Sequence, residues 1–266
     1  MGASQSYWLC AVAVTLVLSA FVPTEADPGA QSSSGQDPSA NVVRILPLGD
    51  SITQGGRRDR PEYTYRYPLY YQLMEAGYSV DFIGSLSTGL QPDAVWPDRN
   101  GVAFDLDHEG HYGWKTAQVR DKLSTWIAKY PAAPDIVLVH LGSNDYEDTN
   151  YYASIIRPLK DIIDILRRAN PRVVVLIGHL NESGLRPWII RQLVKLLVFW
   201  TSTQTSPIVA VDHHKGWRES PDDPLGHTFD GAHPNLEGQT KMAAAWFAKL
   251  TPYLDHIQKQ REQKPQ

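Results

Sequence analysis

The sequence has 266 residues, of which 42% are hydrophobic and 20% are charged. These proportions are typical of one well-packed globular domain and not of a disordered or fibrous chain. The formal net charge of −4 offers no basic surface for nucleic acid or for an anionic membrane, so we expect neither as a partner. Composition therefore excludes several classes of protein without defining a function.

An apolar stretch occupies residues 7–21. It is shorter than the roughly 20 apolar residues that span a bilayer. Residues 24–26 offer a cleavage site, so we expect a secretory signal peptide over residues 1–26 and a secreted, extracellular protein, although no Lys or Arg precedes the apolar stretch. Met1-Gly2 with Ser6 also matches a myristoylation pattern, but the apolar stretch behind it favours export.

Residues 27–41 are rich in Ser, Gly, Pro and Gln, a composition typical of a flexible linker. Apolar periodicity then predicts strands at Val42–Leu48, Val80–Ile83, Ile136–Leu141, Val173–Ile177 and Ile208–Val211. Helices are predicted at Tyr67–Ala76, Thr116–Tyr130, Tyr151–Ala169, Pro187–Phe199 and Leu236–Leu250. Strands that alternate with helices predict one domain over residues 42–256, a three-layer α/β/α sandwich with a five-stranded parallel sheet, followed by a polar tail at 257–266.

The stretch Gly84–Trp114 has no clear periodicity. Long loops in compact domains are commonly functional, so we expect this one to form a wall of the active site. It contains His108-Glu109-Gly110-His111, one residue short of the zinc-protease helix motif. The remaining histidines lack metal-ligand spacing, and we expect neither a metal nor another cofactor.

Polar residues directly follow two of the predicted strands. Gly49-Asp50-Ser51 ends the first strand and places a hydroxyl at its carboxyl end, where open α/β sheets bind ligands. Gly142-Ser143-Asn144-Asp145 follows the strand at 136–141, and the Asn144 carboxamide could donate a hydrogen bond to an oxyanion. Taken alone, each segment is more simply a turn or a helix cap.

A third segment, Asp230-Gly231-Ala232-His233, precedes the last predicted helix. A carboxylate three residues before a histidine can accept a hydrogen bond from its Nδ1, which leaves Nε2 to take a proton from a serine. Asn235 is placed to cap the following helix. In the long loop, Gly113 could present a backbone N–H as a further oxyanion donor.

In order and spacing these segments resemble the SGNH (GDSL-type) hydrolase superfamily, through Gly49-Asp50-Ser51, Gly113, Gly142-x-Asn144-Asp145 and Asp230-x-x-His233. Two further segments are similar to those of the family 3 carbohydrate esterases, the acetylxylan esterases: Asp81-Phe82-Ile83-Gly84-Ser85, and His108 to His111 followed by Gly113-Trp114. The resemblance covers nearly the whole chain after residue 41 and implies the flavodoxin-like SGNH hydrolase fold.

The resemblance also implies roles for particular residues. Ser51 would be the nucleophile, His233 the base and Asp230 the carboxylate that orients it. Ser51, Gly113 and Asn144 would form the oxyanion hole. Another four residues are expected either to support these groups or to line the substrate: Asp50, Asp145, Tyr112 and Trp114. Tyr112 stands where relatives often carry a small residue, which bears on local shape and substrate preference.

We therefore expect a secreted, monomeric serine esterase that deacetylates carbohydrate through an acetyl-enzyme intermediate, with acetylxylan as the favoured substrate. Two alternatives stay open: an esterase or lipase for other short-chain esters, and a non-catalytic carbohydrate-binding protein. The absence of any Gly-x-Ser-x-Gly segment excludes the usual α/β-hydrolase elbow. Asn181-Glu182-Ser183 is an N-glycosylation sequon, which makes Asn181 a candidate glycan acceptor.

Overall fold

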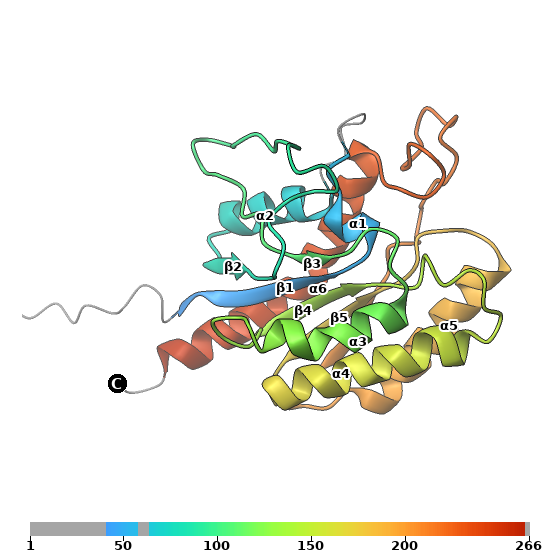
Figure 1. Cartoon of the computed structure of the whole chain (residues 1–266). Helices are drawn as coiled ribbons and strands as arrows, with labels where there is room; N and C mark the ends of the chain where they lie inside the picture. The colour runs from blue at the N-terminus through green and yellow to red at the C-terminus, as the bar shows by residue number, and fades with distance from the viewer. Residues whose placement is uncertain (1–40, 58–63, 264–266) are drawn as a thin grey trace, which may run out of the picture. The chain divides into compact units, whose positions relative to one another are not determined.

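A computed structural model of the chain describes residues 41–57 and 64–263. The expected signal peptide at 1–26, and the expected linker apart from residue 41, lie outside the described residues. In the described part, a parallel sheet carries helices on both of its faces (Figure 1). No helix within those two ranges is both long enough and apolar enough to cross a membrane.

The sheet has the strand order β2-β1-β4-β5-β6, and β3 pairs with the end of β1 beyond the point where β2 stops. Every pairing is parallel. The strands are β1 (Val43–Gly49), β2 (Val80–Phe82), β3 (Glu109–Gly110), β4 (Ile136–His140), β5 (Val174–Gly178) and β6 (Ile208–Val211). The five predicted strands are therefore confirmed, and β3 is a short addition inside the stretch expected to lack regular structure.

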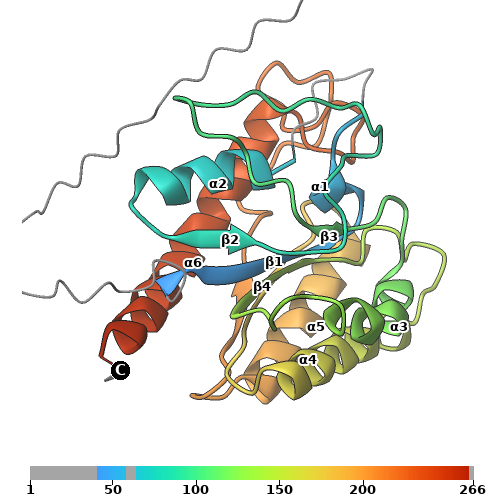
Figure 2. The same cartoon turned by 60° about the vertical axis from the view of Figure 1, so that its left-hand side comes forward.

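Helices cover the two faces of the sheet in two separate sets (Figures 1 and 2). Helices α2 (Arg66–Glu75) and α6 (Leu236–Glu262) pack on one face, and α3 (Thr116–Ile127), α4 (Arg157–Ala169) and α5 (Leu185–Thr201) pack on the other. Within β1, Ile45 belongs to the first core and Leu46 to the second, because successive side chains of a strand point to opposite faces. The predicted three-layer sandwich is confirmed.

A one-turn helix that the sequence did not predict, α1 (Ser51–Gln54), follows β1 directly. The side chain of Asp50 caps it, because its Oδ1 accepts a hydrogen bond from the Ile52 N–H at 3.0 Å. Gly49 makes the tight turn possible: a Cβ there would lie 2.2 Å from Thr53 Oγ1 and 2.7 Å from the carbonyl oxygen of His140. The turn brings Ser51 to the carboxyl edge of the sheet.

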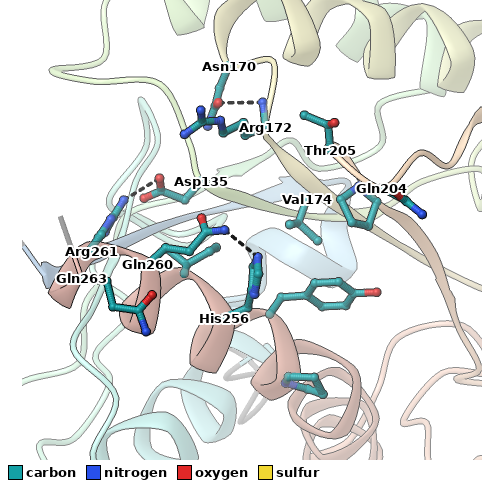
Figure 3. Close-up of a pocket in the computed structure, with 14 residues that line it drawn as sticks. Asp135, Asn170, Arg172, Val174, Gln204, Thr205, His256, Gln260, Arg261 and Gln263 are labelled. Carbon is teal, nitrogen blue, oxygen red and sulfur yellow. Dashed lines mark hydrogen bonds and ion pairs between the residues drawn. The ribbon is translucent and has the colours of Figure 1, made fainter.

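The expected polar tail at 257–266 is wrong for its first six residues, because α6 continues to Glu262. Ile257 packs against the core, and Arg261 donates to the Val42 carbonyl and to Asp135 Oδ1, each at 2.6 Å. This end of α6 borders a hollow of about 1040 Å³ at the amino-terminal edge of the sheet (Figure 3). That hollow lies at the edge opposite to the one that carries Ser51.

Candidate active site

Five residues expected to act together come from four loops at the carboxyl edge of the sheet. Ser51 follows β1, Gly113 follows β3 and Asn144 follows β4, and these three strands are neighbours. Asp230 and His233 lie on the long connection between β6 and α6. The β1–β4 boundary is where the strand order changes direction, which is the usual ligand-binding position of such sheets.

The structure joins Ser51, His233 and Asp230 in one hydrogen-bonded chain, although Ser51 and His233 are 182 residues apart in sequence. The Nε2 of His233 lies 2.9 Å from Ser51 Oγ, and its Nδ1 lies 2.8 Å from Asp230 Oδ2. A carboxylate can only accept here, so Nδ1 carries the proton and Nε2 faces the hydroxyl as an acceptor. This arrangement allows the imidazole to take the serine proton.

Asp230 is held ionised by the groups around it. Partial burial by itself would raise its pKa, but the backbone N–H and ring of His233 and the N–H of Ala232 outweigh that effect and lower the pKa below its usual value. Its Oδ1 accepts both backbone bonds, at 2.7 Å from His233 and 3.1 Å from Ala232. Arg57 adds a cation 3.8 Å from Oδ2. The carboxylate therefore keeps its charge at neutral pH.

Three groups at this edge can donate to an oxyanion. The N–H of Ser51 begins α1, where no intrahelical acceptor exists. Gly113 is exposed and has a φ of +77°, a conformation that favours glycine. Within the described ranges, neither of these backbone N–H groups donates a hydrogen bond. Asn144 Nδ2 donates to the Trp114 carbonyl at 3.0 Å, which fixes the amide and leaves its second N–H for a ligand.

Asp50 and Asp145 support the site from behind and are not part of its wall. Asp50 is fully buried and caps α1, and burial raises its pKa to about 7. Asp145 is 3% exposed, and its Oδ2 accepts from the Thr116 N–H at 3.1 Å and the Thr116 hydroxyl at 2.9 Å. Each carboxylate thus caps the start of a helix next to the site, α1 for Asp50 and α3 for Asp145.

The two aromatic residues expected near the substrate have different places. The ring of Tyr112 stacks on that of His233, with centroids 5.4 Å apart and planes 18° apart. Trp114 instead stacks on His111 at 4.5 Å and contributes its carbonyl to Asn144. Tyr112 therefore belongs to the site itself, and Trp114 to the packing beneath it.

The sequence motifs did not include two residues that lie beside the triad formed by Ser51, His233 and Asp230. Phe229 stacks on His233 with centroids 5.8 Å apart and planes 12° apart. The Arg57 guanidinium lies 6.0 Å from the Phe229 ring centroid, besides pairing with Asp230. Phe229 directly precedes Asp230 and Arg57 follows the Ser51 helix, so closeness to the motifs was the available signal.

Comparison with known proteins places this geometry in a family. A model described as "GDSL-like Lipase/Acylhydrolase family" matches residues 48–241, a span that includes the triad and all three oxyanion donors. The chain belongs to this family. The expected resemblance to the SGNH hydrolases is thereby confirmed.

Solved structures similar to this GDSL-like chain include carbohydrate esterases. An acetyl esterase mutant crystallised with an acetate ion is 28% identical, with a TM-score of 0.67 over 81% of this chain and 100% of that one. A family 3 carbohydrate esterase from Talaromyces cellulolyticus is 28% identical, with a TM-score of 0.66 over 81% of this chain and 99% of that one. A multidomain esterase from Ruminococcus flavefaciens is 29% identical over 242 residues, which are 81% of this chain but 29% of that protein.

The His108–His111 segment of this family member supports the long loop. Glu109 is fully buried and accepts hydrogen bonds from the backbone and hydroxyl of Ser85, from the His111 ring and from the Tyr130 hydroxyl. His108 Nδ1 accepts from the Gly110 N–H at 2.9 Å. Across residues 41–57 and 64–263, no group of three His, Cys, Asp or Glu side chains is arranged to hold a metal ion.

The candidate glycan acceptor Asn181 is buried in the folded chain, which disfavours a glycan there. Its side chain is 3% exposed, its Oδ1 lies 3.2 Å from His140 Nε2, and its Nδ2 donates to Met242 Sδ at 3.3 Å. A sugar on that nitrogen would have to occupy the core between β4 and α6. The sequon gives no sign of this burial, because burial depends on residues far along the chain.

Proposed function

We propose that this GDSL-like chain is a secreted serine esterase that removes acetyl groups from carbohydrate, with acetylated xylan as its substrate. The observation that carries the proposal is the hydrogen-bonded chain from Ser51 through His233 to Asp230, at 2.9 and 2.8 Å. The likeness to an acetyl esterase and to a family 3 carbohydrate esterase supports the acyl group and the substrate class. The signal-peptide pattern of residues 1–26 supports secretion.

In the proposed first step, Ser51 Oγ attacks the ester carbonyl while its proton passes to His233 Nε2. The carbonyl electrons move to oxygen, and the oxyanion accepts hydrogen bonds from Ser51, Gly113 and Asn144. Asp230 remains ionised and stabilises the imidazolium that forms.

The intermediate then collapses to an acetyl-enzyme as the carbon–oxygen bond to the sugar breaks. The imidazolium of His233 donates its proton to the departing sugar oxygen. A water molecule next gives a proton to Nε2 and attacks the acetyl carbon. The second intermediate collapses as the bond between the acetyl carbon and Ser51 Oγ breaks, His233 returns its proton to Oγ, and acetate leaves. No cofactor takes part in either half of this cycle.

The test is acetate release from acetylated xylan, together with hydrolysis of p-nitrophenyl acetate and of longer acyl esters. Ser51→Ala should lower kcat by on the order of 10⁴-fold or more while the thermal unfolding curve stays unchanged. Ser124→Ala is the matched control, because Ser124 is exposed on α3. A Ser51→Ala variant with the wild-type rate would reject the nucleophile.

The wild-type protein separates the alternatives. Faster turnover of longer acyl chains, or activity on p-nitrophenyl acetate without acetate release from acetylated xylan, would reject the substrate and favour another short-chain esterase. Binding to the polymer without hydrolysis of any ester would reject the enzyme and favour a carbohydrate-binding protein.

A further inference from the structure

Two aromatic rings contact the imidazole of His233, and both are nearly parallel to it. Tyr112 comes from the loop after β3 and has its plane 18° from that of the imidazole, whereas Phe229 comes from the loop before α6 and has its plane 12° away. The centroid distances of 5.4 and 5.8 Å fall within the range of favourable offset stacking.

Each of these two aromatic residues also contacts a residue that lies shortly after Ser51 in the sequence. The Tyr112 N–H donates to Gln54 Oε1 at 2.8 Å, and Gln54 lies in α1 three residues after Ser51. On the other ring, the Arg57 guanidinium lies 6.0 Å from the centroid of Phe229. The two ring-bearing residues therefore both lie beside residues at the end of α1 or shortly after it.

The chemistry of the ring contacts changes during the proposed reaction. The face of an aromatic ring carries negative electrostatic potential, so it attracts a cation more strongly than a neutral ring. The imidazole of His233 is neutral before proton transfer and cationic after it. Contacts that strengthen as the charge forms stabilise the transition state more than the ground state, which raises kcat.

We propose that Tyr112 and Phe229 are positioning residues, which hold the imidazole plane so that Nε2 faces Ser51 Oγ and stabilise the imidazolium formed on proton transfer. The proposal rests on the proposed esterase function. The proton moves from Ser51 Oγ to His233 Nε2 as the oxygen–carbon bond forms, and neither aromatic ring gains or loses an atom.

Among residues 41–57 and 64–263, Asp230 and Arg57 are the charged groups that hydrogen bonds and ion pairs place nearest to the imidazole. The Asp230 carboxylate favours the imidazolium directly, and Arg57, 3.8 Å from that carboxylate, opposes it. In the loop that carries Tyr112, His111 lies 2.8 Å from Glu109 and stacks on Trp114, so this pair is directed away from His233. Substitution of Tyr112 leaves all of these charges in place.

The decisive variants are Tyr112→Leu, which removes the ring, and Tyr112→Phe, which keeps it. Loss of a contact between a cation and a ring lowers kcat by about three- to thirty-fold, so Tyr112→Leu should lose that much with KM unchanged. Tyr112→Phe should retain the wild-type kcat within about twofold. Phe229→Leu should reproduce the loss from the second ring. Tyr152→Leu is the matched control, because Tyr152 is exposed on the segment before α4.

The pH–rate profile separates positioning from mere structural support. Without the Tyr112 ring the imidazolium of His233 is less stabilised and forms only at lower pH. The acid limb of the pH–rate profile of Tyr112→Leu should therefore move to lower pH by about half a pH unit or more. A drop in kcat with an unmoved acid limb would overturn the proposal. So would a Tyr112→Phe variant as impaired as Tyr112→Leu.

A second measurement is independent of turnover. The imidazole signals of His233 are titrated by NMR in Ser51→Ala and in Ser51→Ala with Tyr112→Leu. The added substitution should move the titration midpoint to lower pH, and equal midpoints would overturn the proposal. If wild-type protein hydrolysed no ester, the proposed function would fail while this titration still decided whether the rings stabilise the imidazolium.

Discussion

Replacement of Asp230 by Asn changes the group that accepts a hydrogen bond from His233 Nδ1. Asp230 Oδ1 accepts the backbone N–H groups of Ala232 and His233, and the amide oxygen of Asn can keep both bonds. At the position of Oδ2, however, an NH₂ group would face Nδ1 at about the distance of the present 2.8 Å bond. Nδ1 would then become the acceptor, so Nε2 would carry a proton toward the hydroxyl of Ser51, which Nε2 deprotonates in the proposed mechanism.

The structure sets the size of the effect. In Asp230→Asn, the tautomer with the proton on Nδ1 has lost its charge-assisted hydrogen bond to the carboxylate, which costs about 1.5–3 kcal/mol. It also leaves one N–H donor without an acceptor, which costs about 1–3 kcal/mol. The sum of about 2.5–6 kcal/mol corresponds to roughly 10²–10⁴-fold in kcat. Because the Asp230 side chain is 28% exposed, water satisfies part of the lost bonding. We therefore expect the lower half of this range, about 10²–10³-fold.

The assay is steady-state hydrolysis of p-nitrophenyl acetate at pH 7, with urea unfolding measured in parallel. Asp230→Asn should keep its free energy of unfolding within about 1 kcal/mol of wild type, because the backbone hydrogen bonds of the loop remain. Asp222→Asn, an exposed position in the same loop, is the matched control. An Asp230→Asn variant that retained more than about a tenth of the wild-type kcat would refute the tautomer argument.

Three further predictions concern buried ionisable side chains. Burial raises the pKa of Asp50 to about 7, so the stability that its protonated form contributes to the wild type is lost as the pH rises from about 4 to above 7. In urea unfolding, the free energy of unfolding of Asp50→Asn should therefore increase relative to that of wild type between pH 5 and pH 8. A difference that stays constant over this range would contradict the prediction. Burial lowers the pKa of His213 well below its usual value, so its contribution is lost as pH falls below about 6.5. As the pH falls, the free energy of unfolding of His213→Leu should therefore decrease less than that of wild type, by about 1.4 kcal/mol per pH unit. Parallel curves of stability against pH for the two proteins would contradict this. Arg66 is fully buried and donates to three backbone carbonyls, those of Thr53, Gln54 and Leu106. Because Arg66→Met leaves these carbonyls without their donor, it should lower the free energy of unfolding by about 3 kcal/mol. An unchanged urea midpoint would contradict this prediction.

The five longer strands, the five longer helices and the edge that carries the site were predictable from sequence, whereas α1 and β3 were not. A strand buried on both faces is a largely apolar run, as at residues 136–139 in β4, and polar residues directly after such a strand must lie at its carboxyl end. Parallel strands bring those ends to one edge, so Ser51 and Asn144 were expected near each other. The Asp230-x-x-His233 spacing likewise indicated a carboxylate bonded to an imidazole, because three residues of loop suffice for that contact.

Other features depend on contacts between residues far apart in the chain, and no local pattern contains them. The burial of Asn181 follows from the position of Met242 on α6, and the persistence of α6 to Glu262 follows from Arg261 meeting Asp135. The same holds for the Tyr112 ring, which reaches His233 from the loop after β3, whereas Phe229 lies on the same connection as His233. The sequence by itself determined which strands and chemical groups exist, because periodicity and spacing are local. Only the tertiary structure decided what surrounds each group, because packing joins side chains that the chain order keeps apart.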